Sequence, residues 1–434
     1  MFDKPLRSLT AADVLRVCEE AVQEDANVEF KRTLAAKNGK DDVWICGGDA
    51  IGDHARNDLV KEVVAFANAY GGTLILGMDE SGDKPARAAA INALPKCHDL
   101  AERLRLVFRD MIEPRLPRVD AVGIETGGQG EGVVVVQVPR SRSAPHRHKG
   151  DWQCYFRHAD RSEKMPMHEI QDLTLRVRQG VEEIEEKFAM ARREFLTAVD
   201  HVQGIVAAGP EPEPVCGMCA SLVPLEPVNI DHVHRDQGAK PTPLDTKASF
   251  GGSEHTLLRM PLFSGAWRPT LRGSVKTDGS IREKSIASIE VNDDGFIQTY
   301  LIVEKDSSFE ELIIFPSWCE ALFVNSLLFA ERFRAAARAP AAEYGLEFVL
   351  SARGSVARIG AYGHGYPFRF RGTVREGDHA FPRYSIGARE DFGDLASLFD
   401  RDFWNLAGED YDQKLIVDFE DAFSRMPSLN RGLE

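Results

Sequence analysis

The sequence lacks an apolar stretch long enough to cross a membrane. No run approaches the roughly 18 apolar residues that a transmembrane helix needs. Residues 1–17 (MFDKPLRSLTAADVLRV) also lack the apolar core of a secretion signal. We therefore expect a cytoplasmic protein without a membrane partner.

Cysteine is sparse, and its spacing excludes a disulfide-based fold. The chain has seven cysteines, which is an odd number, and they are scattered except for Cys216 and Cys219. Small secreted domains held together by disulfides have denser, even-numbered patterns. Free thiols in a reducing compartment fit this pattern.

The chain also lacks an excess of positive charge. Its formal net charge of −15 argues against a protein that coats nucleic acid non-specifically. The acidity is uneven, because residues 1–180 are nearly balanced and the remainder carries most of the negative charge. The first part can therefore still present a basic face. A G-x4-G-K-[ST] loop is absent, so the sequence gives no reason to assign ATP binding.

With 434 residues, the chain is too long for one ordinary hydrophobic core. Helical and strand-like patterns alternate, which predicts an α/β fold (an α+β mixed sheet) in two domains. The first domain is predicted over 1–200 and a linker over 203–246, where GPEPEPV and KPTPLD occur. A C-terminal α+β domain of unknown role is predicted over 247–434.

Hydrophobic periodicity places the main elements of the first domain. Apolar residues at helical spacing predict amphipathic helices, and apolar runs bounded by glycines predict strands. The helices are expected at 57–69, 98–112 and 167–197, and the strands at 73–78, 119–125, 132–138 and 152–157.

Four segments, in order, resemble the Schlafen family, whose domain is AlbA-like. They are EDANVEFK (24–31), AFANAYGG (65–72), LILGMDE (74–80) and CYFRHADRSEKM (154–165). The resemblance covers about residues 15–180. It implies a nucleic-acid-binding domain, with RNA or DNA as the partner, and in some family members RNA cleavage with tRNA among the substrates.

The resemblance also implies a set of catalytic carboxylates. By position in the family motifs these are Glu24, Glu29 and Glu80, although Glu80 stands where the family has Asp, so Asp79 remains an alternative. Carboxylates from neighbouring elements can hold Mg²⁺ or Mn²⁺, which would neutralise phosphate charge. Lys31 shares a strand face with Glu29 and is a candidate phosphate contact. The alternative is an acidic cluster with a structural role.

A basic and aromatic segment over 140–164 is the candidate nucleic-acid interface. Trp152, Tyr155 and Phe156 are interleaved with cations and histidines, a composition suited to phosphate contact and base stacking. The alternative is a solvated loop with core aromatics. The candidate binding residues are Arg140, Arg142, His146, Arg147, His148, Lys149, Arg157, Arg161 and Lys164.

A second metal site is suggested by Cys216 and Cys219 followed by His232 and His234. Zinc accepts these ligand types in tetrahedral geometry. The usual spacing between two histidine ligands is three to five residues, and here one residue separates them. Two free thiols in a linker are the alternative.

The sequence therefore favours a metal-dependent endoribonuclease acting on tRNA or other structured RNA, in a setting such as bacterial stress or anti-phage (antiviral) defence. A homodimer would provide two AlbA-like lobes, as in larger family members. The rival interpretation is a non-catalytic DNA- or RNA-binding regulator whose C-terminal domain recruits or senses a partner. A nucleotide-sensing scaffold is a weaker third. Dependence on a divalent metal separates the first two.

Overall fold

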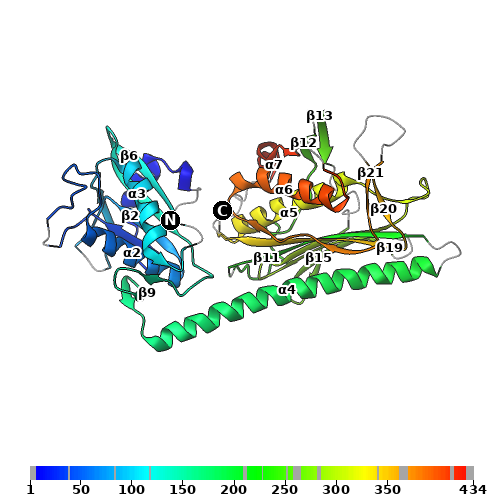
Figure 1. Ribbon diagram of the computed structural model, residues 1–434, viewed down its shortest axis with the longest axis horizontal. Coiled ribbons are helices and arrows are strands. Elements are labelled where there is room, and N and C mark those ends of the chain that lie inside the picture. The colour runs from blue at the N-terminus through cyan, green and yellow to red at the C-terminus, as the bar shows by residue number, and fades with distance from the viewer. Residues whose placement is uncertain are drawn as a thin grey trace. The chain divides into compact units, whose positions relative to one another are not determined.

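The structure is a computed structural model (Figure 1). It describes residues 6–37, 40–82, 85–116, 119–208, 213–226, 228–250, 253–257, 265–280, 285–339, 342–360, 370–410 and 415–426. The chain divides into two compact units, Met1–Glu183 and Ile184–Glu434. Among the helices within these ranges, none combines the length and the apolar character that crossing a membrane requires.

The first unit contains two four-stranded sheets and a small hairpin. The sheets have the strand orders β1-β2-β7-β6 and β10-β9-β8-β5, and β3 pairs with β4. The elements are η1 (Leu6–Ser8), α1 (Ala11–Glu19), β1 (Val28–Lys31), α2 (Asp53–Asn68), β2 (Gly72–Leu76), β3 (Met78–Glu80), β4 (Ala88–Ile91), α3 (Cys97–Met111), β5 (Ile112–Glu113), β6 (Asp120–Gly128), β7 (Glu131–Val138), β8 (Arg147–His148), β9 (Gln153–His158), β10 (Arg161–Lys164) and the start of α4 (Met167–Ala207).

Both faces of the β1-β2-β7-β6 sheet are buried, so its strands are continuously apolar. Leu74 and Val136 face a core shared with α2 and α3. Phe30, Ile75 and Val135 face the opposite core, which α1 covers. Because side chains alternate along a strand, the neighbours of Phe30 on β1, Glu29 and Lys31, point toward the α2 side.

The chain turns sharply between α2 and β2 at a glycine pair. Gly71 has a φ of +74°, a conformation that glycine adopts without strain. A Cβ on Gly72 would lie 2.3 Å from the Phe66 ring. These two glycines let α2 fold back onto the strand that follows it.

The β10-β9-β8-β5 sheet has an inner and an outer face. Tyr155 and Arg157 of β9 are buried on the inner face, where β9 packs against α2. Phe156 and His158 alternate onto the outer face. The first turns of α4 cover part of this outer face through Leu173, which joins Met165 in a small apolar cluster.

The second unit is built on one antiparallel sheet. Its strand order is β14-β15-β16-β17-β11-β19-β22, with β23 also paired to β19. Its elements after α4 are β11 (Val215–Pro224), β12 (Thr246–Phe250), β13 (Ser253–Leu257), β14 (Arg268–Thr270), β15 (Gly273–Ser280), β16 (Ser285–Asn292), β17 (Ile297–Glu304), β18 (Leu312–Ile314), α5 (Pro316–Ala336), β19 (Tyr344–Arg353), β20 (Ala357–Gly360), β21 (Phe370–Val374), β22 (Gly377–Ala380), β23 (Tyr384–Ile386), η3 (Arg389–Asp391), α6 (Phe392–Leu406), β24 (Ile416–Val417) and α7 (Phe419–Arg425).

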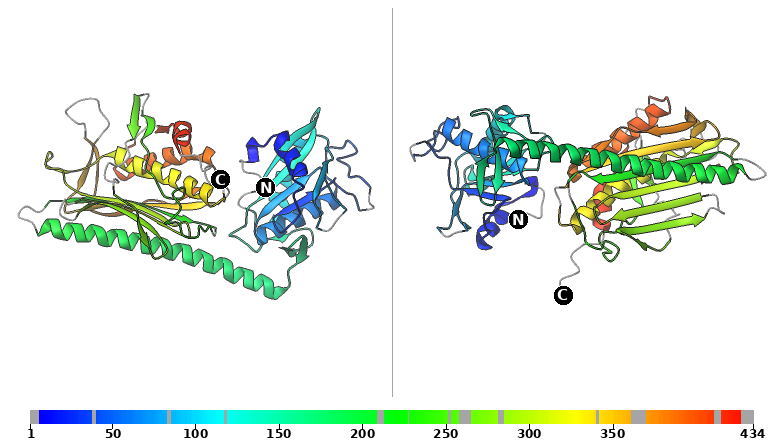
Figure 2. Two further views of the ribbon diagram at one scale, coloured as in Figure 1. Left: turned by 180° about the vertical axis from the view of Figure 1, so that it is seen from behind. Right: turned by 90° about the horizontal axis from the view of Figure 1, so that it is seen from below.

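Helices cover both faces of this sheet. The later part of α4 lies along one face, as both views in Figure 2 show, and buries Phe195 and Val199 against Ile302 and Val349. Helices α5 and α6 cover the other face, where Phe323 and Phe399 stack with ring centroids 4.2 Å apart. The unit is therefore a helix–sheet–helix sandwich.

The linker predicted over 203–246 is wrong for much of its length. Residues Val215–Pro224 form β11, a fully buried strand hydrogen-bonded to β17 on one side and to β19 on the other. The continuous apolar run VCGMCASLV is typical of a strand covered on both faces. The compact units also divide at residues 183/184, within α4, and not near residue 200.

The fold class and the elements of the first unit agree with the sequence. The α+β class is confirmed, and α2 and α3 lie where the periodicity placed them. Helix α4 begins at the predicted residue but runs to Ala207, ten residues past the expected end at 197. Apolar residues such as Val202 and Val206 continue its buried stripe.

Candidate functional site

The acidic residues singled out in the sequence come together beside β1 in the first unit. Glu29 and Lys31 point from β1 toward α2, whose residues Asp58 and Glu62 lie one helical turn apart on the facing side. Lys31 Nζ lies 3.0 Å from Glu29 and 3.4 Å from Asp58. We call Glu24, Glu29, Asp58, Glu62 and Glu80, with Lys31 and Arg157, the acidic cluster.

Arg157 lies at the centre of this cluster and is 1% exposed. Its Nη2 donates to Glu29 Oε2 at 2.7 Å, and its Nη1 donates to Glu62 Oε2 at 3.1 Å. The carbonyl oxygen of Asp25 accepts from Nε at 3.2 Å and from Nη2 at 3.1 Å, and that of Val28 accepts from Nη2 at 3.2 Å. Its guanidinium also lies 4.7 Å from the centroid of the Phe66 ring. One cation from β9 thus joins β1, α2 and the segment before β1.

Lys31 supplies the second cation. Burial alone would lower the pKa of Lys31, but the charges of Glu29, Asp58 and Glu62 outweigh burial and raise the pKa above its ordinary value. Lys31 therefore stays protonated at any physiological pH. Its side chain is about one quarter exposed, so part of its charge faces solvent.

Glu24 and Glu80 complete the cluster. Glu24 Oε1 accepts the backbone N–H of Phe30 at 2.8 Å, which fixes the carboxyl group at the edge of β1. Burial raises the pKa of Glu24 to about 7, the N–H of Phe30 opposes this rise, and the charges of Glu29 and Glu80 add to it. Burial and the charge of Glu29 also raise the pKa of Glu80. These mutual effects place the three sequence-predicted acids within electrostatic reach of one another.

The structure distinguishes Asp79 from Glu80. Adjacent residues on β3 point to opposite sides. Asp79 pairs with Arg32 at 3.1 Å, whereas Glu80 interacts electrostatically with Glu24 and Glu29. Glu80 is therefore the acid of this pair that belongs to the cluster.

Asp58, Glu62 and Ser162 were missed from the sequence. Glu62 is 4% exposed, and its carboxylate also accepts the hydroxyl of Ser162 on β10. A signal was present, because Glu62 stands among Leu59, Val63 and Phe66 on a helix whose other buried residues, apart from Asn68, are apolar. A charge at such a position is rarely buried unless it is paired.

The arrangement does not fit the divalent metal expected from the sequence. Both oxygens of Glu29 are already bound to cations, Oε2 to Arg157 and Oε1 to Lys31. Within the described ranges, no three His, Cys, Asp or Glu side chains are placed as ligands of one metal ion. The buried guanidinium of Arg157 and the partly exposed ammonium of Lys31 supply the positive charge that Mg²⁺ or Mn²⁺ was expected to bring.

Three candidate nucleic-acid contacts have structural roles instead. Arg157 is the buried centre of the acidic cluster. His146 is fully buried between Pro114 O at 2.7 Å and Ser141 Oγ at 2.6 Å. His148 is buried with its Nδ1 2.9 Å from Asp151. His148 and Arg157 point inward because side chains alternate along β8 and β9, and His146 is buried just before β8. The order of residues in the segment does not by itself separate the two faces of the sheet.

The other basic residues of the segment remain accessible. Arg147, Arg161 and Lys164 are exposed, and Arg140, Arg142 and Lys149 are partly exposed. Lys149 donates to Asp110 O at 2.8 Å. The strand register places Arg147 beside Cys154 and Arg161 beside His158, so both arginines lie on the outer face of the β10-β9-β8-β5 sheet.

The zinc site predicted from Cys216, Cys219, His232 and His234 is wrong. The two cysteines lie three residues apart on β11 and point to opposite faces of the sheet, into different apolar cores. Both thiols are buried, and burial raises the pKa of each to about 12. Their spacing resembled a metal motif only because β11 was read as a loop.

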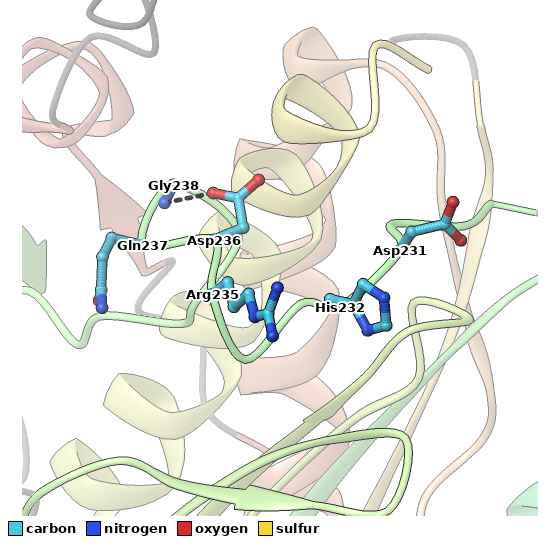
Figure 3. A pocket seen from close by; sticks show the side chains of 6 residues that line it. All are labelled: Asp231, His232, Arg235, Asp236, Gln237 and Gly238. Atoms are coloured by element: carbon cyan, nitrogen blue, oxygen red, sulfur yellow. Dashed lines mark hydrogen bonds between the residues drawn. The ribbon is translucent and has the colours of Figure 1, made fainter.

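The two histidines lie in a separate loop. Their rings contact each other with centroids 5.7 Å apart. His232 lines an open hollow with Asp231, Arg235, Asp236, Gln237 and Gly238 (Figure 3). Asp236 is turned toward its own loop, where it accepts the N–H of Gly238 at 2.7 Å and of Ala239 at 3.2 Å. The Asp236 carboxylate therefore stabilises its own surface turn by hydrogen bonds to the backbone.

Comparisons with known proteins identify the first unit. Residues 24–166 match the model of the family described as Schlafen, AlbA_2, so this part of the chain forms a Schlafen AlbA_2 domain. A solution NMR structure, that of the N-terminal domain of a putative ATP-dependent DNA helicase RecG-related protein from Nitrosomonas europaea, is 23% identical. That match covers 37% of this chain and 97% of that domain, with a TM-score of 0.24. No curated protein matches the chain.

Replacing Arg157 with Met should destabilise the first unit strongly. The substitution leaves Glu29 and Glu62 buried without their shared cation, which typically costs about 3–5 kcal/mol. Arg161→Met, on the exposed face of the next strand, should change stability by about 0.5 kcal/mol or less. Urea denaturation measures the stability of each variant, and amide hydrogen exchange in β1 and β9 locates the change in the first unit. Equal stability of the two variants would contradict a structural role for Arg157.

Glu24→Gln should remove a pH dependence of stability. In the folded chain the pKa of Glu24 is about 7, whereas an unfolded Glu titrates near pH 4.3. Between these values the folded state holds the proton more tightly, so stability falls as pH rises from about 4 to about 7 and is constant above. Thermal melts should show Glu24→Gln matching the parent at pH 4 and exceeding it at pH 8. If the difference in melting temperature between the variant and the parent is the same at pH 4 and at pH 8, the raised pKa of Glu24 is disproved.

Proposed function

We propose that this chain, whose residues 24–166 form a Schlafen AlbA_2 domain, binds nucleic acid through the outer face of its β10-β9-β8-β5 sheet. The main support for this proposal is that Arg147 and Arg161 are both exposed on this face. The family of the domain also points to a function related to nucleic acid. Guanidinium groups bind phosphate oxygens in bidentate fashion. The acidic cluster lies on the inner side of the same sheet.

Double substitution of Arg147 and Arg161 by Gln should weaken binding of labelled single-stranded RNA or DNA. Each lost phosphate contact should reduce the slope of log affinity against log salt by about 0.7–0.9. Fluorescence anisotropy at several salt concentrations measures both effects. The matched control is Arg401→Gln, an exposed arginine on α6 of the second unit. A parent chain that binds neither nucleic acid at low salt would refute the proposal.

A second candidate function is phosphodiester cleavage, and one observation favours it. Glu24, Glu29 and Glu80, which correspond to the family motifs, lie near one another, with Lys31 bonded to Glu29. Glu24, with a pKa of about 7, can hold or release a proton near neutral pH, which suits a general acid or base. Lys31 offers a permanent positive charge to a phosphate. An endoribonuclease acting on tRNA or another structured RNA, in a setting such as stress or phage defence, is the corresponding proposal.

Glu80→Gln is the diagnostic change for cleavage, because Glu80 is exposed and outside the Arg157 contacts. If the cluster is catalytic, incubation with total tRNA should give discrete fragments that the variant does not produce, with unchanged thermal stability. Parallel reactions with Mn²⁺ and with a chelator test the expected metal requirement. Asp79→Asn is the control on the same strand. Intact tRNA in every reaction, with binding retained, would leave a non-catalytic binding module.

The remaining expectations are proposals that rest on the resemblance. A homodimer would place two Schlafen-type domains in one particle, as in the two-lobed members of the family. If the chain is a non-catalytic binding module, the second unit, which lies outside the family match, would recruit or sense a partner. Light scattering of the full chain tests the homodimer, since a monomeric particle would contradict it.

A further inference from the structure

Trp152 is an exposed aromatic residue held in an unfavourable backbone conformation. Its side chain lies in the turn between β8 and β9 and is 56% exposed. Its φ of +59° is in the left-handed region, which bulky residues rarely adopt. Such strain persists where the surroundings enforce it, and it is concentrated at functional sites such as ligand clamps. An exposed indole gains little from burial here, so core packing does not explain its position.

The turn is anchored from the inner side of the sheet. The N–H of Trp152 donates to His148 O at 2.8 Å. The neighbouring Asp151 carboxylate accepts from Tyr155 Oη, from His148 Nδ1 at 2.9 Å and from Gln153 N at 3.1 Å. Burial would raise the pKa of Asp151, but these hydrogen bonds outweigh burial and lower it. The carboxylate therefore stays charged and keeps the turn in one conformation.

Arg147 covers one side of the indole. Its guanidinium lies 4.6 Å from the centroid of the Trp152 ring. Glu113 Oε2 accepts from Arg147 Nε at 3.2 Å and from Nη2 at 3.0 Å, which orients the guanidinium. The chain thus presents a flat, oriented arginine–tryptophan stack to solvent at the end of the basic outer face.

We propose that Trp152 and Arg147 form a stacking platform for a nucleobase of single-stranded nucleic acid. The exposed indole offers a flat apolar surface, and base–aromatic stacking tolerates any base. Bases in a duplex already stack on their neighbours, so a base must be unpaired to reach this site. The adjacent arginine favours a ligand that carries negative charge beside its flat group, which a nucleotide does. Because this inference names the ligand of the proposed face, it rests on the proposed function.

The experiment compares two labelled probes of equal length, an oligouridine and an abasic sugar-phosphate chain, on the full-length protein. Trp152→Ala should weaken oligouridine binding about 5- to 150-fold, the range expected for one lost stack, and leave abasic binding unchanged. Trp152→Phe should retain most of the affinity and lose the quenching of tryptophan fluorescence on binding. Leu106→Ala, which removes an exposed apolar side chain from α3, is the control.

The outcomes separate the two claims. If the parent binds both probes and Trp152→Ala binds them with unchanged affinity, the platform is overturned while the binding function stands. Equal weakening on both probes also overturns it, because the effect would then arise from the backbone contacts or from folding. A parent that binds neither probe overturns the platform, and it overturns the proposed function as well if the labelled RNA and DNA of the arginine experiment also fail to bind.

Discussion

The buried guanidinium of Arg157 is the interaction on which the first unit depends. It neutralises one carboxylate on β1 and one on α2, and it binds the backbone carbonyl groups of Asp25, before β1, and of Val28, the first residue of β1. A buried charge is costly unless its partners and hydrogen bonds are nearly complete, and here each of the three guanidinium nitrogens donates to at least one acceptor. The position of β9, and with it both faces of the β10-β9-β8-β5 sheet, follows from this contact.

The sequence located the acids of this cluster but not their partners. The motif around Glu24 and Glu29 is local, so it is visible in a short segment. Arg157 is 128 residues from Glu29 and was assigned to a nucleic-acid surface because its neighbours in sequence are basic. Only the strand register shows that Arg157 and Arg161 serve opposite faces. An ion pair between residues so far apart in the sequence depends on the fold, and the sequence carries no periodic pattern that predicts it.

The failures in the second unit have the same origin. Proline-rich segments on both sides of β11 indicated a linker, although the apolar run between them predicts a buried strand. Accepting the linker then made Cys216 and Cys219 available as metal ligands. Because β11 lies between β17 and β19 in the sheet, side chains three residues apart on it point to opposite faces, and the two thiols lie in separate cores. One wrong assignment of a strand thus produced both errors, whereas the periodic helices α2 and α3 were found directly.

A negatively charged chain can bind nucleic acid if its charges are segregated. At physiological salt, exposed charges act over about 8 Å, so a phosphate responds to the face it touches and little to the net charge of −15. In the first unit Glu29 of β1 and Glu62 of α2 are buried around Arg157, while Arg147 and Arg161 stay exposed. Arg157 points inward and Arg147 and Arg161 point outward because side chains alternate along the strands of the β10-β9-β8-β5 sheet. The same alternation that buries Tyr155 beneath the turn leaves the Trp152–Arg147 stack on the basic side, where an unpaired base and its phosphate can meet it together.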